Sequence, residues 1–294
     1  KYYSLNDDTT FISVFHDENY VAWIVKYDIF DSLQLNTLHL KDEYNIFESY
    51  SPEPSTIYAN NNIYRIGYYY DDNIIYNINK NSITKIPSLN VPRGYTSLTY
   101  SDKYGLFVIG GATDDDNDEF DVIYNNCDLY NENTNKWITL SPMNNKKMWN
   151  TCLSFNDYLF ECGKDEGCKT CSIYNINNNK WTNIIDMNFI REKPGIAYDY
   201  TKNRIFVGGG YSSTHQIEYY DIYSLKHKWI NLPDTNMGYQ RNPSLYINEN
   251  GVIVISAQFC ELYDTRINNS KWIRIALPQY TKKYNKYPYY VTKQ

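Results

Sequence analysis

The residues best suited to chemistry in this 294-residue chain are its six cysteines and four histidines. Three cysteines lie close together, and Cys168 and Cys171 have the Cys-x-x-Cys spacing of zinc and redox sites. A structural zinc site needs four ligands, and no second pair has this spacing. We therefore interpret Cys162, Cys168 and Cys171 as buried or loop thiols and predict no metal and no cofactor. A four-cysteine site completed by Cys152 is the alternative.

The histidines indicate no reaction. His16, His39, His215 and His227 are far apart in sequence and fall in different predicted strands and turns. General acid–base or nucleophilic catalysis needs at least two suitable groups within hydrogen-bond reach of each other. The sequence pairs no nucleophile with a base, so we predict that the chain is not an enzyme.

Charged residues form two groups that suit a binding partner. The first is a recurring series of cations: Arg93, Lys146, Lys147, Arg191, Lys193 and Arg241. Arginine presents a planar fork that fits carboxylates. The second is the acidic run that contains Asp114, Asp115 and Asp116 and ends at Glu119. This run suits a basic partner, and its alternative interpretation is a solvated loop.

Composition restricts the class of partner and the compartment. The chain has 34 acidic and 28 basic residues, a formal net charge of −6, so we expect no nucleic-acid partner. No apolar run approaches the length of a membrane span, so we expect no membrane partner. Sparse cysteines predict a cytoplasmic protein. A first residue other than methionine predicts a fragment of a longer protein.

The elements that must position these residues are repeated. Aromatic residues make up 17% of the chain, with 33 tyrosines, which favours β-strands. Four segments share a tyrosine, an Asn- or Asp-rich turn, a lysine and a tryptophan. Their anchors are Tyr130 and Trp137, Tyr174 and Trp181, Tyr220 and Trp229, and Tyr263 and Trp272. Such a recurring pattern indicates a repeat architecture.

Two weaker copies precede these four. Tyr76 leads to Ile83 and Phe30 leads to Thr37, without a tryptophan. Upstream of the anchors, short apolar strands such as residues 21–25 end in small residues, which permit positive φ or close backbone approach. The glycines at these ends are Gly110 and Gly111, Gly163, and Gly208 and Gly209. Each repeat thus predicts four short strands, with tyrosine ending the third and tryptophan opening the fourth.

One four-stranded sheet of this size cannot bury both faces, whereas sheets stacked around an axis can, which predicts a β-propeller. The sequence also resembles the kelch motif, in which a hydrophobic strand and Gly-Gly precede Tyr and Trp at fixed separation. The resemblance implies an all-β, kelch-type propeller of six four-stranded blades, with seven as the alternative. The expected blades of this single domain, residues 1–294, are 10–41, 55–87, 95–141, 149–186, 194–233 and 243–278, followed by a closing segment, 279–294.

The closing segment has two interpretations. Residues 286–292 resemble the first strand of a blade. They are predicted either to pair with the region around residues 2–5 and close the ring, or to begin a seventh blade. We favour closure.

Antiparallel strands place two kinds of loop on one face of such a propeller: those between the second and third strands, and those between blades. The resemblance implies that partners bind on this face. Both charged groups fall there, as do Tyr69 and His215. The predicted partner contacts are Arg93, Lys147, Arg191, Arg241, Asp114, Asp115, Asp116, Tyr69 and His215.

The sequence therefore predicts a protein-interaction module that binds a peptide or protein partner. By resemblance, such a propeller serves as the target-recognition part of a ubiquitin-ligase adaptor or of another multidomain kelch protein. The alternative is a kelch-fold enzyme, or a binder of sugar or another small molecule, that uses the axial pocket. A copper site like that of galactose oxidase, an enzyme of this fold, needs convergent His and Tyr ligands, and no such set is evident. We therefore favour a macromolecular partner over a small molecule.

Overall fold

The computed structural model describes most of the chain, and the regular structure in it is entirely β-strand. The described residues are 10–16, 22–28, 34–40, 55–68, 73–114, 120–164, 167–239, 243–248, 251–255, 260–275 and 289–291.

Five four-stranded antiparallel sheets are each built from one continuous part of the chain. The first contains β4 (Ser55–Ala59), β5 (Asn62–Ile66), β6 (Ile74–Asn77) and β7 (Ser82–Lys85). The second contains β8 (Ser97–Ser101), β9 (Gly105–Ile109), β12 (Cys127–Asn131) and β13 (Lys136–Thr139). The third contains β14 (Thr151–Phe155), β15 (Tyr158–Cys162), β16 (Cys171–Asn175) and β17 (Lys180–Asn183).

The fourth contains β18 (Gly195–Asp199), β19 (Arg204–Gly208), β20 (Ile217–Asp221) and β21 (Trp229–Asn231). The fifth contains β22 (Ser244–Asn248), β23 (Gly251–Ile255), β24 (Cys260–Asp264) and β25 (Ile273–Ile275). In every one of these sheets, neighbouring strands pair in an antiparallel manner.

A further four-stranded sheet joins the first and last described strands. Its order is β26 (Tyr289–Val291), β1 (Thr10–His16), β2 (Ala22–Asp28) and β3 (Gln34–Leu40). Ser13 lies opposite Tyr290 in the pairing of β1 with β26. The closing segment therefore supplies an innermost strand, but its partner is β1 and not the region of residues 2–5, which lies outside the described residues.

The sequence-based assignment of the first repeat was wrong by one strand. Residues 21–25 were expected to form the second strand of a blade, whereas β2 occupies the third place in its sheet. Thr37 lies opposite Val25, and Phe30 is outside the described residues. The error arose because β3 has no tryptophan to mark the register and the innermost strand comes from the far end of the sequence.

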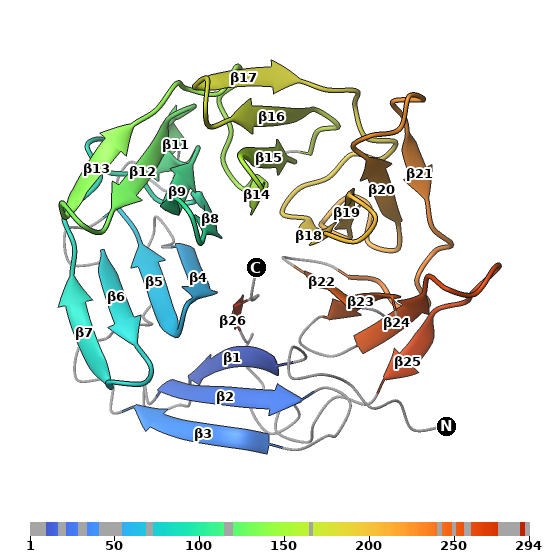
Figure 1. Ribbon diagram of the computed structural model, residues 1–294, viewed down its shortest axis with the longest axis horizontal. Coiled ribbons are helices and arrows are strands. Elements are labelled where there is room, and N and C mark those ends of the chain that lie inside the picture. The colour runs from blue at the N-terminus through green and yellow to red at the C-terminus, as the bar shows by residue number, and fades with distance from the viewer. Residues whose placement is uncertain are drawn as a thin grey trace.

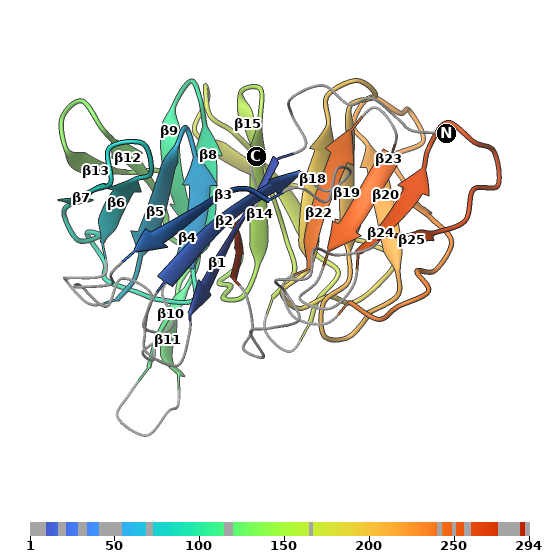
Figure 2. The same cartoon turned by 90° about the horizontal axis from the view of Figure 1, so that it is seen from below.

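The sheets are arranged around a central axis as a β-propeller (Figure 1). The first strands of the sheets and β26 lie nearest the axis, and β4 contacts β8, β8 contacts β14, β14 contacts β18, and β18 contacts β22. The fourth strands lie at the circumference. This arrangement presents the connections between strands on two opposite faces, seen at the top and bottom of Figure 2.

The hydrophobic core lies between neighbouring sheets. On β9, Leu106 and Val108 pack with the first sheet, whereas Phe107 and Ile109 pack with the third. Because successive side chains of a strand point to opposite faces, a strand buried on both sides must be apolar throughout. The apolar second strands that the sequence revealed are therefore the central layers of the core.

In the second and third sheets, the tyrosine that ends the third strand also organises the turn that follows it. The Tyr130 hydroxyl donates a hydrogen bond to Asn135 Oδ1 at 2.7 Å, and the Tyr174 hydroxyl donates to Asn179 Oδ1 at 2.6 Å. Asn135 and Asn179 have φ of +50° and +54°, a left-handed conformation that asparagine tolerates better than most residues. In the fourth sheet, the Tyr220 hydroxyl instead meets His227 Nδ1 at 3.3 Å.

Each tryptophan that opens a fourth strand links its blade to the preceding one. Its ring packs on the cross-strand tyrosine, with centroids 5.0–5.5 Å apart. Its indole N–H donates to a backbone carbonyl of the preceding blade. The pairs are Trp137 with Pro87, Trp181 with Ser141, Trp229 with Ile185, and Trp272 with Pro233, at 2.7–3.0 Å. The Tyr–Trp pair therefore packs its own sheet together and also joins that sheet to the preceding one.

The glycine pairs are required by backbone conformation and by crowding. Gly110 and Gly111 have φ of +65° and +110°, and an added Cβ would collide with the carbonyl oxygens of Lys147 and Gly94. In the fourth sheet the equivalent pair is Gly209 and Gly210, with φ of +63° and +99°. The sequence-based choice of Gly208 with Gly209 was one residue too early, because three consecutive glycines hide the register.

Candidate functional site

The candidate site is the loop face, which we define as the connections between second and third strands together with the connections between blades. Its most prominent feature is a hairpin of β10 (Ala112–Asp114) and β11 (Phe120–Ile123), which was expected only as an acidic loop. The hairpin projects from the lower side of the molecule in Figure 2.

Arg93 lies in the connection before β8 and is completely buried. Its Nη2 donates to Asp128 Oδ2 at 2.7 Å, and its Nε donates to the carbonyl oxygen of Gly110 at 2.7 Å. Its Nη1 donates to the carbonyl oxygen of Val91 at 2.8 Å. One guanidinium group therefore joins the connection between blades, the end of β9 and the third strand, β12.

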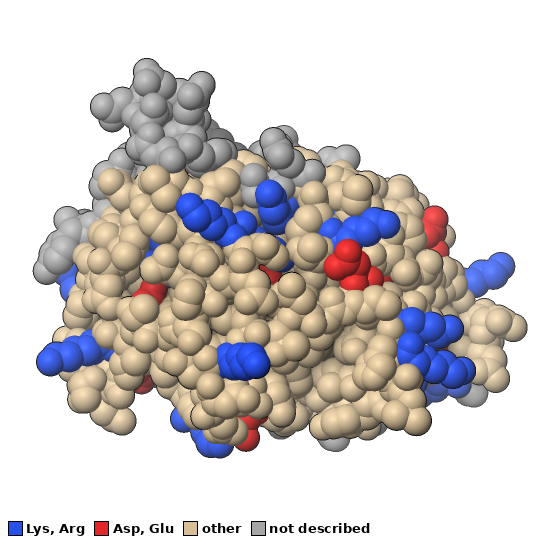
Figure 3. Space-filling model, turned by 90° about the horizontal axis from the view of Figure 1, so that it is seen from above, with Lys and Arg blue, Asp and Glu red and all other residues tan. Residues whose placement is uncertain are grey.

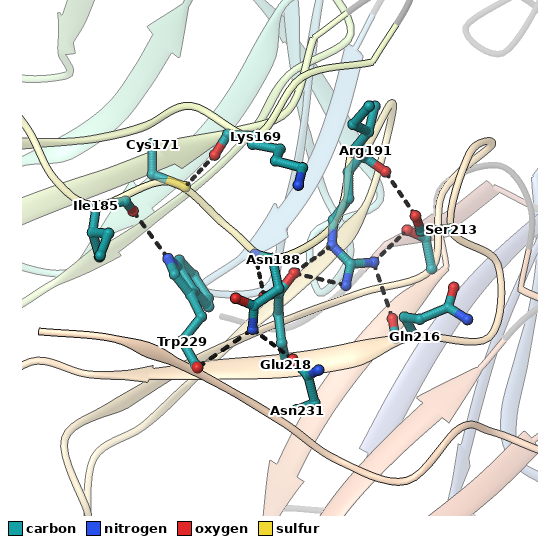
Figure 4. Close-up of polar contacts among 12 residues, drawn as sticks. Lys169, Cys171, Ile185, Asn188, Arg191, Ser213, Gln216, Glu218, Trp229 and Asn231 are labelled. Atoms are coloured by element: carbon teal, nitrogen blue, oxygen red, sulfur yellow. Dashed lines mark hydrogen bonds and ion pairs between the residues drawn. The ribbon is translucent and has the colours of Figure 1, made fainter.

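Arg191 repeats this arrangement before β18. Its Nη1 donates to the carbonyl oxygens of Gly209, at 2.9 Å, and Gln216, at 3.0 Å. Its Nε and Nη2 donate to Glu218 Oε1 at 3.2 and 3.0 Å. Figure 4 shows the guanidinium group directed at this carboxylate. Glu218 and Asp128 occupy the same position, two residues before the tyrosine of the third strand.

Lys147 occupies the equivalent position before β14, with its carboxylate partner on a different strand. Its Nζ lies 2.8 Å from Glu161 Oε1 and donates to the carbonyl oxygen of Thr170 at 3.2 Å. Ser172 stands where the other blades have the acid, directly opposite Glu161, and its hydroxyl donates to Glu161 Oε2 at 2.9 Å. Burial raises the pKa of Glu161, although Lys147 and Ser172 oppose the shift.

The three cations therefore form no exposed basic ring. Arg93, Lys147 and Arg191 are each buried against a carboxylate. Direct contact with a partner would require these pairs to be exposed, so we assign them a supporting function beneath the loop face. Each of the three acids lies beside its cation because of how the strands pair. The spacing of residues in the sequence did not reveal that pairing.

The remaining predicted contacts are distributed differently. Tyr69, Asp115, Asp116 and Arg241 lie outside the described residues. Asp114 ends β10 opposite Phe120, next to a register shift in the hairpin. His215 is half-buried, and its Nδ1 lies 2.9 Å from the carbonyl oxygen of Thr235, so its ring secures the following connection between blades. The structure does not test whether any of these residues binds a partner.

Sequence reasoning named Lys193 only as one of the loop-face cations and missed the row of three residues to which it belongs, which we call the ladder residues: Tyr95, Trp149 and Lys193. Their φ angles are +53°, +53° and +47°, a left-handed conformation that is uncommon for bulky side chains. Trp149 N–H donates to the carbonyl oxygen of Tyr95 at 3.3 Å, and Lys193 N–H donates to that of Trp149 at 3.1 Å. The row thus connects three consecutive blades.

The side chains of the ladder residues also contact one another. The rings of Tyr95 and Trp149 meet edge to face, with centroids 5.6 Å apart. Lys193 Nζ lies 4.2 Å from the centroid of the Trp149 ring, a cation–π contact. Each ladder residue follows a buried cation by two positions, and this spacing was visible in the sequence. The left-handed conformation was not, because no glycine or asparagine marks it.

The cysteines remain thiols. All six are free, and Cys162 lies directly opposite Cys171 on β15 and β16. Burial raises the pKa of Cys171 and of Cys152, so both are protonated at neutral pH. Within the described stretches, no three His, Cys, Asp or Glu side chains are placed to hold a metal ion. The same stretches contain no helix of the length and apolarity needed to cross a membrane.

Two comparisons with known proteins found no relative. No protein-family model matches the sequence, and a search among curated proteins found no match. The assignment of the chain to the β-propellers therefore depends on its strand pairing and on the arrangement of its sheets.

Proposed function

We propose that the chain is a six-bladed, kelch-type propeller in the cytoplasm and a protein-interaction module, with its loop face binding a peptide or protein partner. The repeated glycine, tyrosine and tryptophan contacts support the kelch type, and the sheet that β26 completes supports six blades. On this proposal the chain selects the target within a larger adaptor and does not catalyse a reaction.

The ladder residues are the observation that carries the proposal. A bulky residue in the left-handed conformation costs roughly 1–3 kcal/mol and persists only where the surroundings enforce it. Glycine or asparagine would satisfy the same backbone at lower cost. Three such positions, in three consecutive blades, form an aromatic and cationic row on one face, in which Trp149 and Lys193 are half-buried and Tyr95 supports them from below. Strain of this kind concentrates at binding sites.

Substitution of Lys193 by asparagine tests the proposal. Lys193→Asn relieves the backbone strain and removes the cation, so the thermal midpoint should stay equal or rise slightly while partner capture falls. The measurement is quantitative mass spectrometry of proteins captured from cytosolic extract by the wild type and the variant. Lys180→Asn, at the start of β17 on the opposite face, is the matched control and should capture the same proteins as the wild type. Equal capture by all three proteins would refute the proposed site.

A further inference from the structure

The face opposite the loop face, which we call the turn face, carries an exposed apolar group at one place. Tyr200, Tyr223, Leu225 and Ile267 expose 64%, 70%, 95% and 57% of their surface. Tyr200 lies in the turn between β18 and β19, Tyr223 and Leu225 lie between β20 and β21, and Ile267 lies between β24 and β25. Large apolar side chains this exposed and this close in position indicate an interaction surface.

These turns are joined to one another. The Ile222 N–H donates to the carbonyl oxygen of Asn203 at 3.1 Å, which connects the two turns of the fourth sheet. Lys202 Nζ donates to Thr265 Oγ1 at 3.2 Å, which connects the fourth sheet to the fifth. The four apolar side chains therefore belong to one surface, which we call the turn patch.

The cations of the turn patch are exposed and are mostly lysines. They are Lys202, Lys226, Lys228, Arg266 and Lys271. Two nearby acids are already engaged, since Asp264 pairs with Arg266 at 2.6 Å and Asp221 lies 3.6 Å from Arg204. Among the described side chains, no carboxylate forms an ion pair with Lys226, Lys228 or Lys271. Figure 3 shows basic side chains gathered on the part of the molecule that holds β20 and β21 in Figure 1.

The neighbouring turns show that this composition is not required by the fold. The equivalent turn after β16 contains Asn177, Asn178 and Asn179 and performs the same backbone function. The turn after β20 has Tyr223, Leu225 and lysines instead. The apolar and basic composition of the turn after β20 is therefore not needed to make a turn at this place in a blade.

We propose that the turn patch docks the propeller on an anionic lipid bilayer. Leu225 and Ile267 lie in turns and expose 95% and 57% of their surface, which suits entry into a soft interface. Lysines are flexible point charges without a fixed hydrogen-bonding geometry, which suits mobile headgroups. Aromatic and aliphatic side chains beside lysines are the composition of surface-bound membrane segments. The expectation of no membrane partner considered only membrane-spanning runs.

Vesicle flotation tests the proposal with the whole chain. Wild-type protein should float with phosphatidylcholine vesicles that contain phosphatidylserine and should not float with pure phosphatidylcholine vesicles. Binding should weaken as salt is raised, because screening reduces attraction to the charged surface. Leu225→Ser should lower the affinity by about tenfold or more, and Lys226→Gln by about fivefold.

A turn exchange provides the control for folding. Residues 222–228 are replaced by the Ile-Asn-Asn-Asn-Lys sequence of residues 176–180, which should abolish flotation while the thermal midpoint is retained. Lys180→Gln should bind vesicles like the wild type. Absence of wild-type flotation, equal flotation with neutral vesicles, or flotation that survives the exchange would each overturn the proposal. Binding to polyuridylate or polyglutamate in place of vesicles would overturn it in favour of a nucleic-acid or acidic protein partner.

Discussion

Buried ion pairs determine how the loop face is attached to the blades. Arg93 with Asp128 and Arg191 with Glu218 are completely enclosed, and their remaining donors are used by backbone carbonyls. The cost of desolvating two charges is recovered only when such extra hydrogen bonds are made. Sequence reasoning found the cations but not their burial, because the acids lie on strands whose register had to be known first.

Breaking one of these pairs should be far more harmful than breaking a surface pair. Arg93→Met leaves Asp128 buried without its partner and should lower the free energy of unfolding by about 3–5 kcal/mol. Lys103→Met removes an exposed pair with Asp157, 2.7 Å long, and should change the free energy of unfolding far less, because water screens exposed charges. Denaturant unfolding of both variants measures the difference. Similar losses in the two variants would mean that Arg93 is not the structural cation described.

The buried carboxyl of Glu161 makes stability depend on pH. Burial raises its pKa above the ordinary value of about 4.3. The native state therefore holds this proton more tightly than the unfolded chain, so the contribution of Glu161 falls as pH rises from about 4.3 through the raised native pKa. In Glu161→Gln this decline should disappear. Unfolding free energies measured across the interval should show a flatter slope for the variant, and parallel curves would contradict the prediction.

Strands and turns were the most predictable elements. Tyr130 opposite Trp137 and Tyr174 opposite Trp181 confirm the register that the spacing implied. The register predicted for the weak copy, with Tyr76 opposite Ile83, is also confirmed. Prediction failed where the signal was repeated or missing. Three adjacent glycines concealed the register at Gly209, and β2 and β3 lack the Tyr–Trp pair.

The indole hydrogen bond between blades can be removed with little change of shape. Trp181→Phe keeps an aromatic ring beside Tyr174 but leaves the carbonyl oxygen of Ser141 without its donor. We expect a loss of about 1–3 kcal/mol in the free energy of unfolding. The exposed Thr182→Val on the same strand should change it by about 0.5 kcal/mol or less. Equal effects in urea titrations would show that the bond between blades contributes little.

At the scale of the molecule, one short pairing joins the first and last described strands and closes the six-bladed ring that we propose. β26 contributes three residues, and Tyr290 lies opposite Ser13 at the centre of the pairing. A proline there cannot donate to the ladder, so Tyr290→Pro should open the ring, lower the thermal midpoint and broaden the transition. Tyr290→Val preserves strand propensity and is the control. A sharp, unshifted transition for the proline variant would show that closure does not depend on β26.

The sequence allowed different features to be predicted on the two faces of the propeller. The loop face was predicted from strand order, and its ladder residues were missed because backbone conformation is not visible in spacing. The turn patch was missed because the turns after third strands were interpreted as uniform. Yet Leu225 and Lys226 already set one of them apart. Both proposals can hold together, since the faces are on opposite sides of the ring.

The hydrogen bonds that the tryptophan indoles donate between blades also indicate an order in which the blades can assemble. In all four, the carbonyl acceptor comes earlier in sequence than the indole donor, as in Pro87 with Trp137 and Pro233 with Trp272. A ribosome delivers about 5–20 residues per second, so each acceptor blade emerges seconds before its donor. The nascent protein can therefore lengthen as an open arc, each blade docking on a finished neighbour. By contrast, β1 must wait for β26, a strand that is translated much later than β1 itself.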